Sequence, residues 1–301
     1  MSSSQTVIVF GPTGRVGSVV ALVAHEEGAQ VVLAMRDPSK QIPTLKNISA
    51  ERVQADLNQP ETIKAAVEQS KARRAFIYLA HATRDGMRSS IEALKEAGVE
   101  SVVFLSSFSV SEDPHTIPPT EFVPYMHAQV EISLDEVFGD NGIVVRPGFF
   151  ASNMISMKNE ILSGEVKFAN PDAKLDWIVP SDIGRVCGKL LVHGSDERVI
   201  GLVGPQLLSY GDAIAIIARS IGKEVQVIRL EGEEAVQDAM KKSGLPRVVA
   251  EWFVANITGP ASDISTTPDY ASALKNVDVY TGQAPLTFEQ WLEEKKDLFL
   301  E

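Results

Sequence analysis

The chain has 301 residues and a formal net charge of −12, because 40 Asp and Glu residues outnumber 28 Lys and Arg residues. A surface this acidic repels nucleic acid and anionic membranes, which both bind clustered cations, so we expect neither as a partner. The single cysteine, Cys187, cannot form an internal disulfide, which fits a reducing, cytoplasmic compartment. No apolar stretch approaches the ~20 residues that span a bilayer, and no set of side chains has the spacing of metal ligands.

The first stretch, residues 6–17, predicts a strand, a tight turn and the start of a helix that runs to about residue 27. An apolar, β-branched run ends at Gly11, and Gly14 and Gly17 follow at intervals of three residues. These glycines allow a sharp turn, a close approach to a phosphate and close packing of the helix on the sheet. Free N–H groups and the positive end of the helix dipole then face a pyrophosphate, which predicts a dinucleotide site.

Residues 30–35 predict the second strand, and Arg36, Asp37 and Lys40 follow it. In dinucleotide-binding folds the end of this strand faces the adenosine ribose, where an acid selects NAD and an arginine accommodates the 2′-phosphate of NADP. Arg36 can pair with a phosphate through two hydrogen bonds, and Lys40 adds a second cation. We therefore predict NADP as the cofactor, while Asp37 leaves binding of the NAD ribose open.

Three further strands are predicted at residues 52–55, 75–80 and 101–105, separated by helices of 10–15 residues. Strands that alternate with helices predict an α/β fold with a Rossmann-type, doubly wound parallel sheet. The carboxyl ends of its strands meet at one edge, beside the glycine turn. The residues that follow these strands should converge around one ligand; they are Gly11, Arg36, Asp56, Ala80 and Ser106.

The pattern changes midway, so we assign residues 1–150 to an NAD(P)-binding domain and 151–301 to a smaller, mostly helical substrate-binding region. Some segments of the second region are expected to return to the sheet. The elements predicted in it are a strand at 225–229, helices at about 232–243 and 246–257, and loops over the Gly-, Pro-, Ser- and Thr-rich segment 258–285. Parts of this region should cover the sheet edge and form a substrate pocket.

Short motifs follow one another along the chain in a specific order. They are Gly11-x-x-Gly14-x-x-Gly17, Arg36-Asp37-Pro38, Asp56-Leu57, Leu105-Ser106-Ser107, His127-x-x-x-Glu131, Arg146-Pro147-Gly148-x-Phe150-x-x-Asn153, Asp182-Ile183-Gly184 and Thr287-Phe288-Glu289-Gln290-Trp291. This order resembles that of the atypical short-chain dehydrogenase/reductases, and within them the NmrA-like group. That group includes quinone-reductase-like and isoflavone-reductase-like enzymes as well as NADP-sensing regulators, and the likeness spans nearly the whole chain.

The resemblance implies a set of contacts with NADP(H). The residues that would hold the pyrophosphate are Gly11, Thr13, Gly14, Arg15, Val16 and Gly17. The other implied contacts are Arg36 with the 2′-phosphate, Asp56 and Leu57 with the adenine, Ala80 and His81 near the nicotinamide-side ribose, and Phe149 and Phe150 beside the nicotinamide.

The proton donor of short-chain reductases is usually the tyrosine of a Tyr-x-x-x-Lys pair, in which the lysine activates the phenol. Tyr125 occupies the tyrosine position here, but the lysine position holds Gln129. Since a neutral amide cannot activate a phenol in this way, Tyr125 is expected to be a slow general acid.

His127 is the other candidate catalytic residue, because an imidazole with an ordinary pKa of about 6.5 suits proton transfer at neutral pH. It falls near the position where isoflavone-reductase-type relatives place a lysine. Glu131 lies one helical turn further along and is expected to orient the ring. The alternative is that His127 only hydrogen-bonds the cofactor ribose or a backbone carbonyl.

The function that these patterns favour is NADPH-dependent hydride transfer to a small carbonyl, enone or quinone. Two other functions remain open, namely a non-catalytic NADP(H) sensor that binds a protein partner and a non-redox enzyme on the same fold. A pocket with room for substrate over the nicotinamide would favour an enzyme, and a blocked pocket the sensor. The sequence does not identify the substrate or distinguish a monomer from a homodimer.

Overall fold

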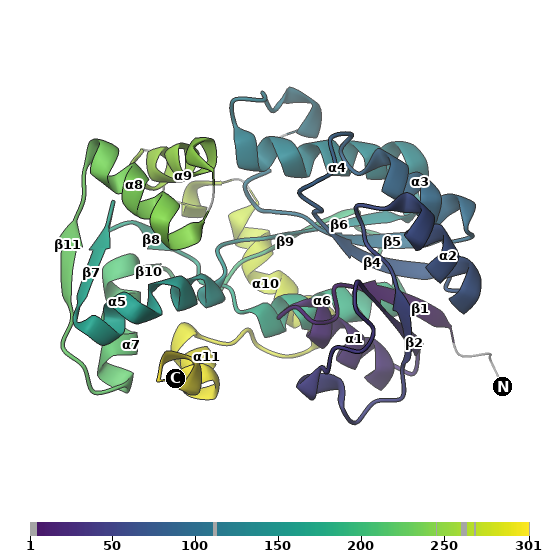
Figure 1. Cartoon of the computed structure of the whole chain (residues 1–301), viewed down its shortest axis with the longest axis horizontal. Helices are drawn as coiled ribbons and strands as arrows, with labels where there is room; N and C mark the ends of the chain where they lie inside the picture. The colour runs from purple at the N-terminus through teal and green to yellow at the C-terminus, as the bar shows by residue number, and fades with distance from the viewer. Residues whose placement is uncertain (1–4, 111–112, 245, 260–263, 268, 301) are drawn as a thin grey trace.

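The computed structural model of the chain describes residues 5–110, 113–244, 246–259, 264–267 and 269–300, and within them the largest sheet has seven strands (Figure 1). In spatial order these are β3 (Glu51–Gln54), β2 (Gln30–Met35), β1 (Thr6–Phe10), β4 (Arg74–Tyr78), β5 (Ser101–Leu105), β6 (Gly142–Pro147) and β9 (Val199–Leu202). All neighbouring pairs are parallel. The chain starts in the middle of the sheet and winds outward in both directions, which confirms the predicted doubly wound fold.

Helices cover both faces of this sheet (Figure 1). On one face lie α2 (Pro60–Ser70), α3 (Arg88–Glu96) and α4 (Phe122–Phe138), and on the other lie α1 (Gly17–Glu26), α6 (Pro180–His193) and α10 (Tyr270–Thr281). Successive strand residues alternate between these layers, as Ile8 packs toward α2–α4 while Val7 and Val9 pack toward α1 and α6. Because both faces are buried, the central residues of β1, β2, β4, β5 and β6 are apolar, whereas the edge strand β3 carries charged and polar residues.

The second half of the chain also builds a mainly helical region beside the sheet edge (Figure 1). Its elements are α5 (Lys158–Ser163), β7 (Glu165–Phe168), β8 (Lys174–Leu175), β10 (Leu208–Ser209), α7 (Tyr210–Ser220), β11 (Gln226–Arg229), α8 (Gly232–Ser243), α9 (Arg247–Thr258) and α11 (Phe288–Lys295). The short 3₁₀ turns among the described residues are Pro43–Leu45, Pro114–Thr116, Gly139–Asn141, Ala151–Met157, Ile264–Thr266 and Lys296–Phe299. β7 pairs with β11 and β8 with β10, and an aromatic core around Trp177 joins these elements.

The loop prediction for residues 258–285 is wrong over most of its second half, because α10 (Tyr270–Thr281) lies there. Ala273 and Val277 are fully buried at helical spacing, and Asn276 Nδ2 donates to the Gly201 carbonyl at 2.9 Å. The helix thus covers the outer strand β9. The sequence predicts a loop here because Gly, Pro, Ser and Thr are frequent on either side of this segment. The helix has only a short apolar face, and tertiary packing of that face stabilises it.

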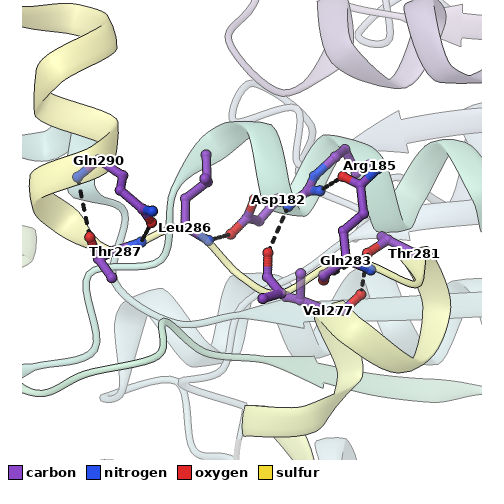
Figure 2. A network of polar contacts seen from close by, with 9 residues as sticks. Asp182, Arg185, Val277, Thr281, Gln283, Leu286, Thr287 and Gln290 are labelled. Carbon is purple, nitrogen blue, oxygen red and sulfur yellow. Dashed lines mark hydrogen bonds and ion pairs between the residues drawn. The ribbon is translucent and has the colours of Figure 1, made fainter.

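A buried carboxylate ties the last helix to the sheet layer (Figure 2). Asp182, in the first turn of α6, is fully buried, accepts the Leu286 N–H at 2.7 Å and pairs with Arg185 at 2.5 Å. Burial raises the pKa of this carboxyl, although the bonds from Arg185 and Leu286 oppose the shift. Thr287 and Gln290 then form a capping box that starts α11 directly after the anchored residue.

Two glycines allow α6 to lie against α1. A Cβ on Gly184 would lie 2.5 Å from Val19 Cβ, and one on Gly188 would lie 2.7 Å from Val23 Cβ. Real side-chain atoms do not approach this closely, so the two helices share a surface that has no space for even one methyl group.

We therefore expect Gly188→Ala to lower the free energy of unfolding by about 1–3 kcal/mol, the usual cost of overpacking. Gly211→Ala is the matched control, because a Cβ in α7 would be 3.4 Å from its nearest neighbour, the Pro171 carbonyl oxygen. That variant should be neutral or slightly more stable, since alanine favours helix. Urea unfolding of both variants tests this, and equal midpoints for Gly188→Ala and the parent would contradict it.

Candidate functional site

The glycine turn between β1 and α1 has the geometry of an anion cradle. A Cβ on Gly17 would lie only 2.3 Å from the Gly11 carbonyl oxygen, so the helix begins in contact with the end of the strand. Gly11 has a φ of +68°, and the Gly14 N–H donates to its carbonyl at 3.0 Å. No side chain caps α1, but the Ser18 and Val19 N–H groups donate to the Gly14 and Val16 carbonyls, so an anion would be bound by the N–H groups that precede them. Thr13 and Arg15 are exposed on this turn, whereas Val16 is buried.

The loop after β2 exposes two cations, while one carboxylate oxygen of its acid is hydrogen-bonded within the loop. Arg36 and Lys40 are exposed, while the Asp37 carboxylate accepts the Ser39 N–H at 3.0 Å and the Ser39 hydroxyl at 2.6 Å. These two bonds lower the pKa of Asp37. Arg52 on β3 braces the loop through the Pro38 and Lys40 carbonyls. Asp37 Oδ1 therefore closes its own turn, beside two exposed cations that can pair with a phosphate.

Tyr78 is a residue of this edge that the sequence analysis missed. It ends β4, and a Cβ on Gly11 would lie 2.6 Å from its Cε1, so the ring edge contacts the glycine turn. Burial raises the pKa of the Tyr78 phenol, and the charges of Arg36 and Asp56 also act on it. The ring therefore borders both the turn and the adenosine end. An aromatic residue at the end of a strand was the signal available in the sequence.

The residues after β3 and β5 turn their polar groups toward the protein. Asp56 Oδ1 accepts from the Asn58 N–H at 3.0 Å and from its side-chain amide at 2.8 Å, and Leu57 is buried. Ser106 is also buried, and its hydroxyl donates to Glu131 at 2.5 Å. The parallel sheet does bring these strand ends to one edge, together with Ala80 and His81 after β4.

The expected pairing of Glu131 with His127 is wrong. Glu131 is buried and accepts two bonds from Arg146, from Nε at 3.1 Å and from Nη2 at 2.5 Å. Arg146 on β6 is itself buried, and a buried guanidinium needs a fixed counterion. Glu131 meets that need and is therefore unavailable to the imidazole. The spacing of His127 and Glu131 places both side chains on α4, but it does not indicate that Arg146 of β6 lies within reach of the Glu131 carboxylate.

His127 itself lies against the carboxyl end of β5, with its ring 6.2 Å from that of Phe104. Burial, with a smaller contribution from the charge of His81, lowers its pKa to about 4. Its Nδ1 is buried without a hydrogen-bond partner. A proton on this atom would be a buried unpaired donor, so the neutral tautomer that carries hydrogen on Nε2 is favoured. At neutral pH His127 is therefore an uncharged hydrogen-bond donor rather than an imidazolium acid.

Tyr125 faces a different part of the molecule from the predicted nicotinamide position. It packs against a small cluster formed by Val110, Ile117 and Ala128. Two residues before it on α4, Val123 lines the large cavity described below, whereas Tyr125 does not. Helical geometry explains the difference, since residues two apart on a helix point in widely separated directions. His127 shares a face with Val123 but does not line the cavity either.

The segment after β6 is held by a second buried carboxylate that the sequence analysis did not identify. Asp176 is fully buried and accepts the Phe149 N–H at 2.8 Å and the Gly204 N–H at 3.0 Å. Burial raises its pKa to about 6, and the two backbone bonds oppose that shift. A Cβ on Gly148 would lie 2.3 Å from Asp176 Oδ2, so the carboxylate occupies the space that a side chain would need. Phe149 consequently turns toward the helical region, while Phe150 packs toward the α1–α6 layer.

A cavity of about 510 Å³ lies between the sheet edge and the helical region. Arg15 of the glycine turn and Val123 of α4 line its sheet side. Its aromatic lining residues are Phe149, Phe168, Tyr210, Trp252 and Phe253. The lining is largely apolar, and the charge of Lys242 is neutralised by Glu160 at 2.9 Å and by Asp238 at 2.7 Å. The cavity therefore suits an uncharged, apolar molecule that reaches the glycine turn.

In the part of the chain that the structure describes, no group of three or more His, Cys, Asp or Glu side chains is arranged to hold a metal ion. The described helices also include none that is long and apolar enough to cross a membrane.

Comparisons with known proteins agree with this geometry. A model of the NmrA-like family matches residues 3–292. The nitrogen metabolite regulation-like protein bik4 of Gibberella fujikuroi is 35% identical over 317 residues, which cover 96% of each chain. An NAD(P)H azoreductase of Xenophilus azovorans is 27% identical and covers 95% of this chain and 96% of its own. The NADPH complex of the Escherichia coli quinone oxidoreductase QOR2 has the same fold, with a TM-score of 0.76, 18% identity and coverage of 97% and 99%.

The depressed pKa of His127 predicts a specific pH dependence of stability. The unfolded chain takes up a proton near pH 6.5, whereas the folded imidazole stays neutral down to about pH 4. Acid therefore favours unfolding across this window, by at most about 3 kcal/mol. The free energy of unfolding of the parent should fall relative to that of His127→Gln as the pH drops from 6.5 to 4. Titration of Asp176 is common to both proteins and cancels, so parallel curves would show that the imidazole is not desolvated.

Proposed function

The chain belongs to the NmrA-like family, and on that premise we propose that it is an NADPH-dependent reductase that transfers hydride to a small, uncharged enone, quinone or related carbonyl compound. The observation that supports this most is the apolar cavity of about 510 Å³, which reaches Arg15 of the glycine turn and Phe149. A substrate in this cavity would lie beside the predicted nicotinamide position. A protein that only sensed the cofactor would have no need of such a space.

Three features of the strand edge support NADPH as the cofactor. The glycine turn and the uncapped start of α1 would hold the pyrophosphate, and exposed Arg36 and Lys40 would bind the 2′-phosphate. Asp37 Oδ1 accepts both bonds from Ser39, which engages one of the two oxygens that would bind a ribose diol. NADPH would supply the hydride, and the chain supplies binding, orientation and the exclusion of water.

The proposed acceptor follows from the available proton donors. His127 is a neutral donor with a pKa of about 4, and neither His127 nor Tyr125 is among the residues that line the cavity. A neutral N–H stabilises a developing oxyanion by a hydrogen bond without transferring its proton. Hydride addition to an enone or quinone gives a delocalised anion that needs no strong acid at the moment of transfer. A simple ketone gives a localised alkoxide, so we place ketones below conjugated acceptors.

A second candidate function is an NADP(H)-sensing regulator. The relative bik4 is named for nitrogen metabolite regulation, and Gln129 replaces the lysine that activates the tyrosine of short-chain reductases. The same cofactor contacts would serve this function, which differs from the first in having no turnover. A non-redox enzyme on the same fold would likewise bind cofactor without oxidising it.

Cofactor selectivity is expected to depend on Arg36. Charge-assisted hydrogen bonds are worth about 1.5–3 kcal/mol, so Arg36→Ala should weaken NADPH binding by roughly tenfold to a hundredfold and leave NADH binding nearly unchanged. Asp37→Asn is the matched control, because an amide oxygen can still accept from Ser39, and it should keep the preference for NADPH. Calorimetric titration with both nucleotides tests this. Equal affinities of the parent for NADH and NADPH would overturn it.

Turnover is tested by single-turnover oxidation of NADPH with a panel of quinones, enones and ketones. We expect His127→Ala to slow transfer to the best acceptor by ~10²-fold, the usual cost of one donor to an oxyanion. The rate of the parent should change little between pH 6 and 8, because an imidazole with a pKa of about 4 does not titrate there. A parent that binds NADPH but reduces no acceptor would favour the sensor or the non-redox enzyme.

A further inference from the structure

Tyr210 lies at the wall of the cavity, at the first position of α7. Only 2% of its surface is exposed. Its ring is held by aromatic neighbours on three sides, with centroid distances of 3.9 Å to Phe168, 5.0 Å to Trp177 and 5.7 Å to Phe149. The ring is therefore fixed in place, and the direction of its hydroxyl is fixed with it.

The Tyr210 hydroxyl has no hydrogen-bond partner among the residues that the structure describes, whereas the indole N–H of the neighbouring Trp177 has one. Trp177 Nε1 donates to the Leu208 carbonyl at 2.8 Å within the same aromatic cluster. Leaving a buried hydroxyl unpaired costs roughly 1–3 kcal/mol, so such a group calls for an explanation. Over the described residues, the side-chain atoms sealed from solvent without a partner are His127 Nδ1 and Arg198 Nε. The Tyr210 oxygen is not one of them, and the residue lines the cavity.

We propose that the Tyr210 hydroxyl is a substrate-anchoring hydrogen-bond donor, and that the ligand of this cavity is a planar, uncharged aromatic molecule with an oxygen or nitrogen acceptor. The proposal rests on the reductase function proposed above, and it names the substrate class and the residue that recognises it. Aromatic walls from Phe149, Phe168 and Phe253 favour a flat ring system.

The charge state of the cavity supports the same class. Lys242 is already paired with Glu160 and Asp238, so it offers no free charge to an anionic ligand. Arg15, the other cation of the lining, belongs to the turn that would hold the pyrophosphate. Burial keeps the pKa of Tyr210 well above its ordinary value, so the hydroxyl retains its proton and can donate it in a hydrogen bond. A site built this way discriminates strongly against ligands that lack the acceptor.

The test compares two ligands of the same ring system, 2-methyl-1,4-naphthoquinone and 2-methylnaphthalene, by calorimetry without cofactor. The parent should bind the quinone more tightly than the hydrocarbon. Tyr210→Phe should lower the affinity for the quinone about tenfold, the worth of one neutral hydrogen bond, and leave the affinity for the hydrocarbon unchanged. Loss of affinity for both ligands alike, or for neither, would overturn the proposal, as would failure of the parent to bind the quinone.

Thermal unfolding provides a second readout that separates an anchoring hydroxyl from a structural one. Tyr210→Phe should unfold at the same temperature as the parent or higher, because it removes an unpaired buried hydroxyl. Tyr280→Phe is the matched control, since its hydroxyl donates to Glu197 at 3.1 Å, far from the cavity. That variant should lose stability and keep quinone affinity. A lowered unfolding temperature for Tyr210→Phe would show that the hydroxyl is structural. These measurements involve no turnover, so a protein that binds the quinone through Tyr210 but does not oxidise NADPH would refute only the reductase function.

Discussion

The contact between Gly17 and the Gly11 carbonyl is the constraint on which the arrangement of the site depends. Because no Cβ fits between them, α1 starts where β1 ends, at the carboxyl edge of the sheet. The same close packing continues below the sheet, where Gly184 and Gly188 allow α6 to lie against α1. A parallel sheet then brings the loops after β2, β3, β4 and β5 to that edge. The turn therefore lies beside the loops in which we predict the other cofactor contacts.

Two buried aspartates join the second region to this edge. Asp176 accepts backbone N–H groups from the segments that follow β6 and β9, and Asp182 holds the Leu286 N–H that precedes α11. Burying a carboxylate is costly unless hydrogen bonds compensate, and here the compensating donors are mostly backbone groups at fixed places. Each aspartate therefore fixes the backbone of the segments whose N–H groups it accepts in one place. Polar contacts fix the cavity walls relative to the sheet, and aromatic packing fills the space behind them.

The sheet is the part of the molecule that the sequence predicts well, since strand, turn and helix signals there are local. What the sequence does not predict depends on residues far apart in the chain. Glu131 pairs with Arg146 rather than His127 because the buried guanidinium on β6 binds the carboxylate through two hydrogen bonds. The helix α10 is stabilised by its packing against β9. The sequence also contains no indication that Asp37 Oδ1 accepts from the Ser39 N–H and hydroxyl. The sequence does not single out Tyr210, because the cavity that this residue lines is formed by segments far apart in the chain.

Burial has opposite consequences for the two kinds of chemistry that such a site could perform. Desolvation lowers the pKa of His127 to about 4, so the ring loses its value as a proton donor at neutral pH. The same low polarity strengthens a hydrogen bond from its neutral N–H, because water does not screen it or compete for it. Tyr210 follows the same logic, since burial keeps its hydroxyl protonated and its ring fixed. An apolar cavity with a neutral donor stabilises spread charge better than localised charge, and this is the reason why we propose conjugated acceptors rather than simple ketones.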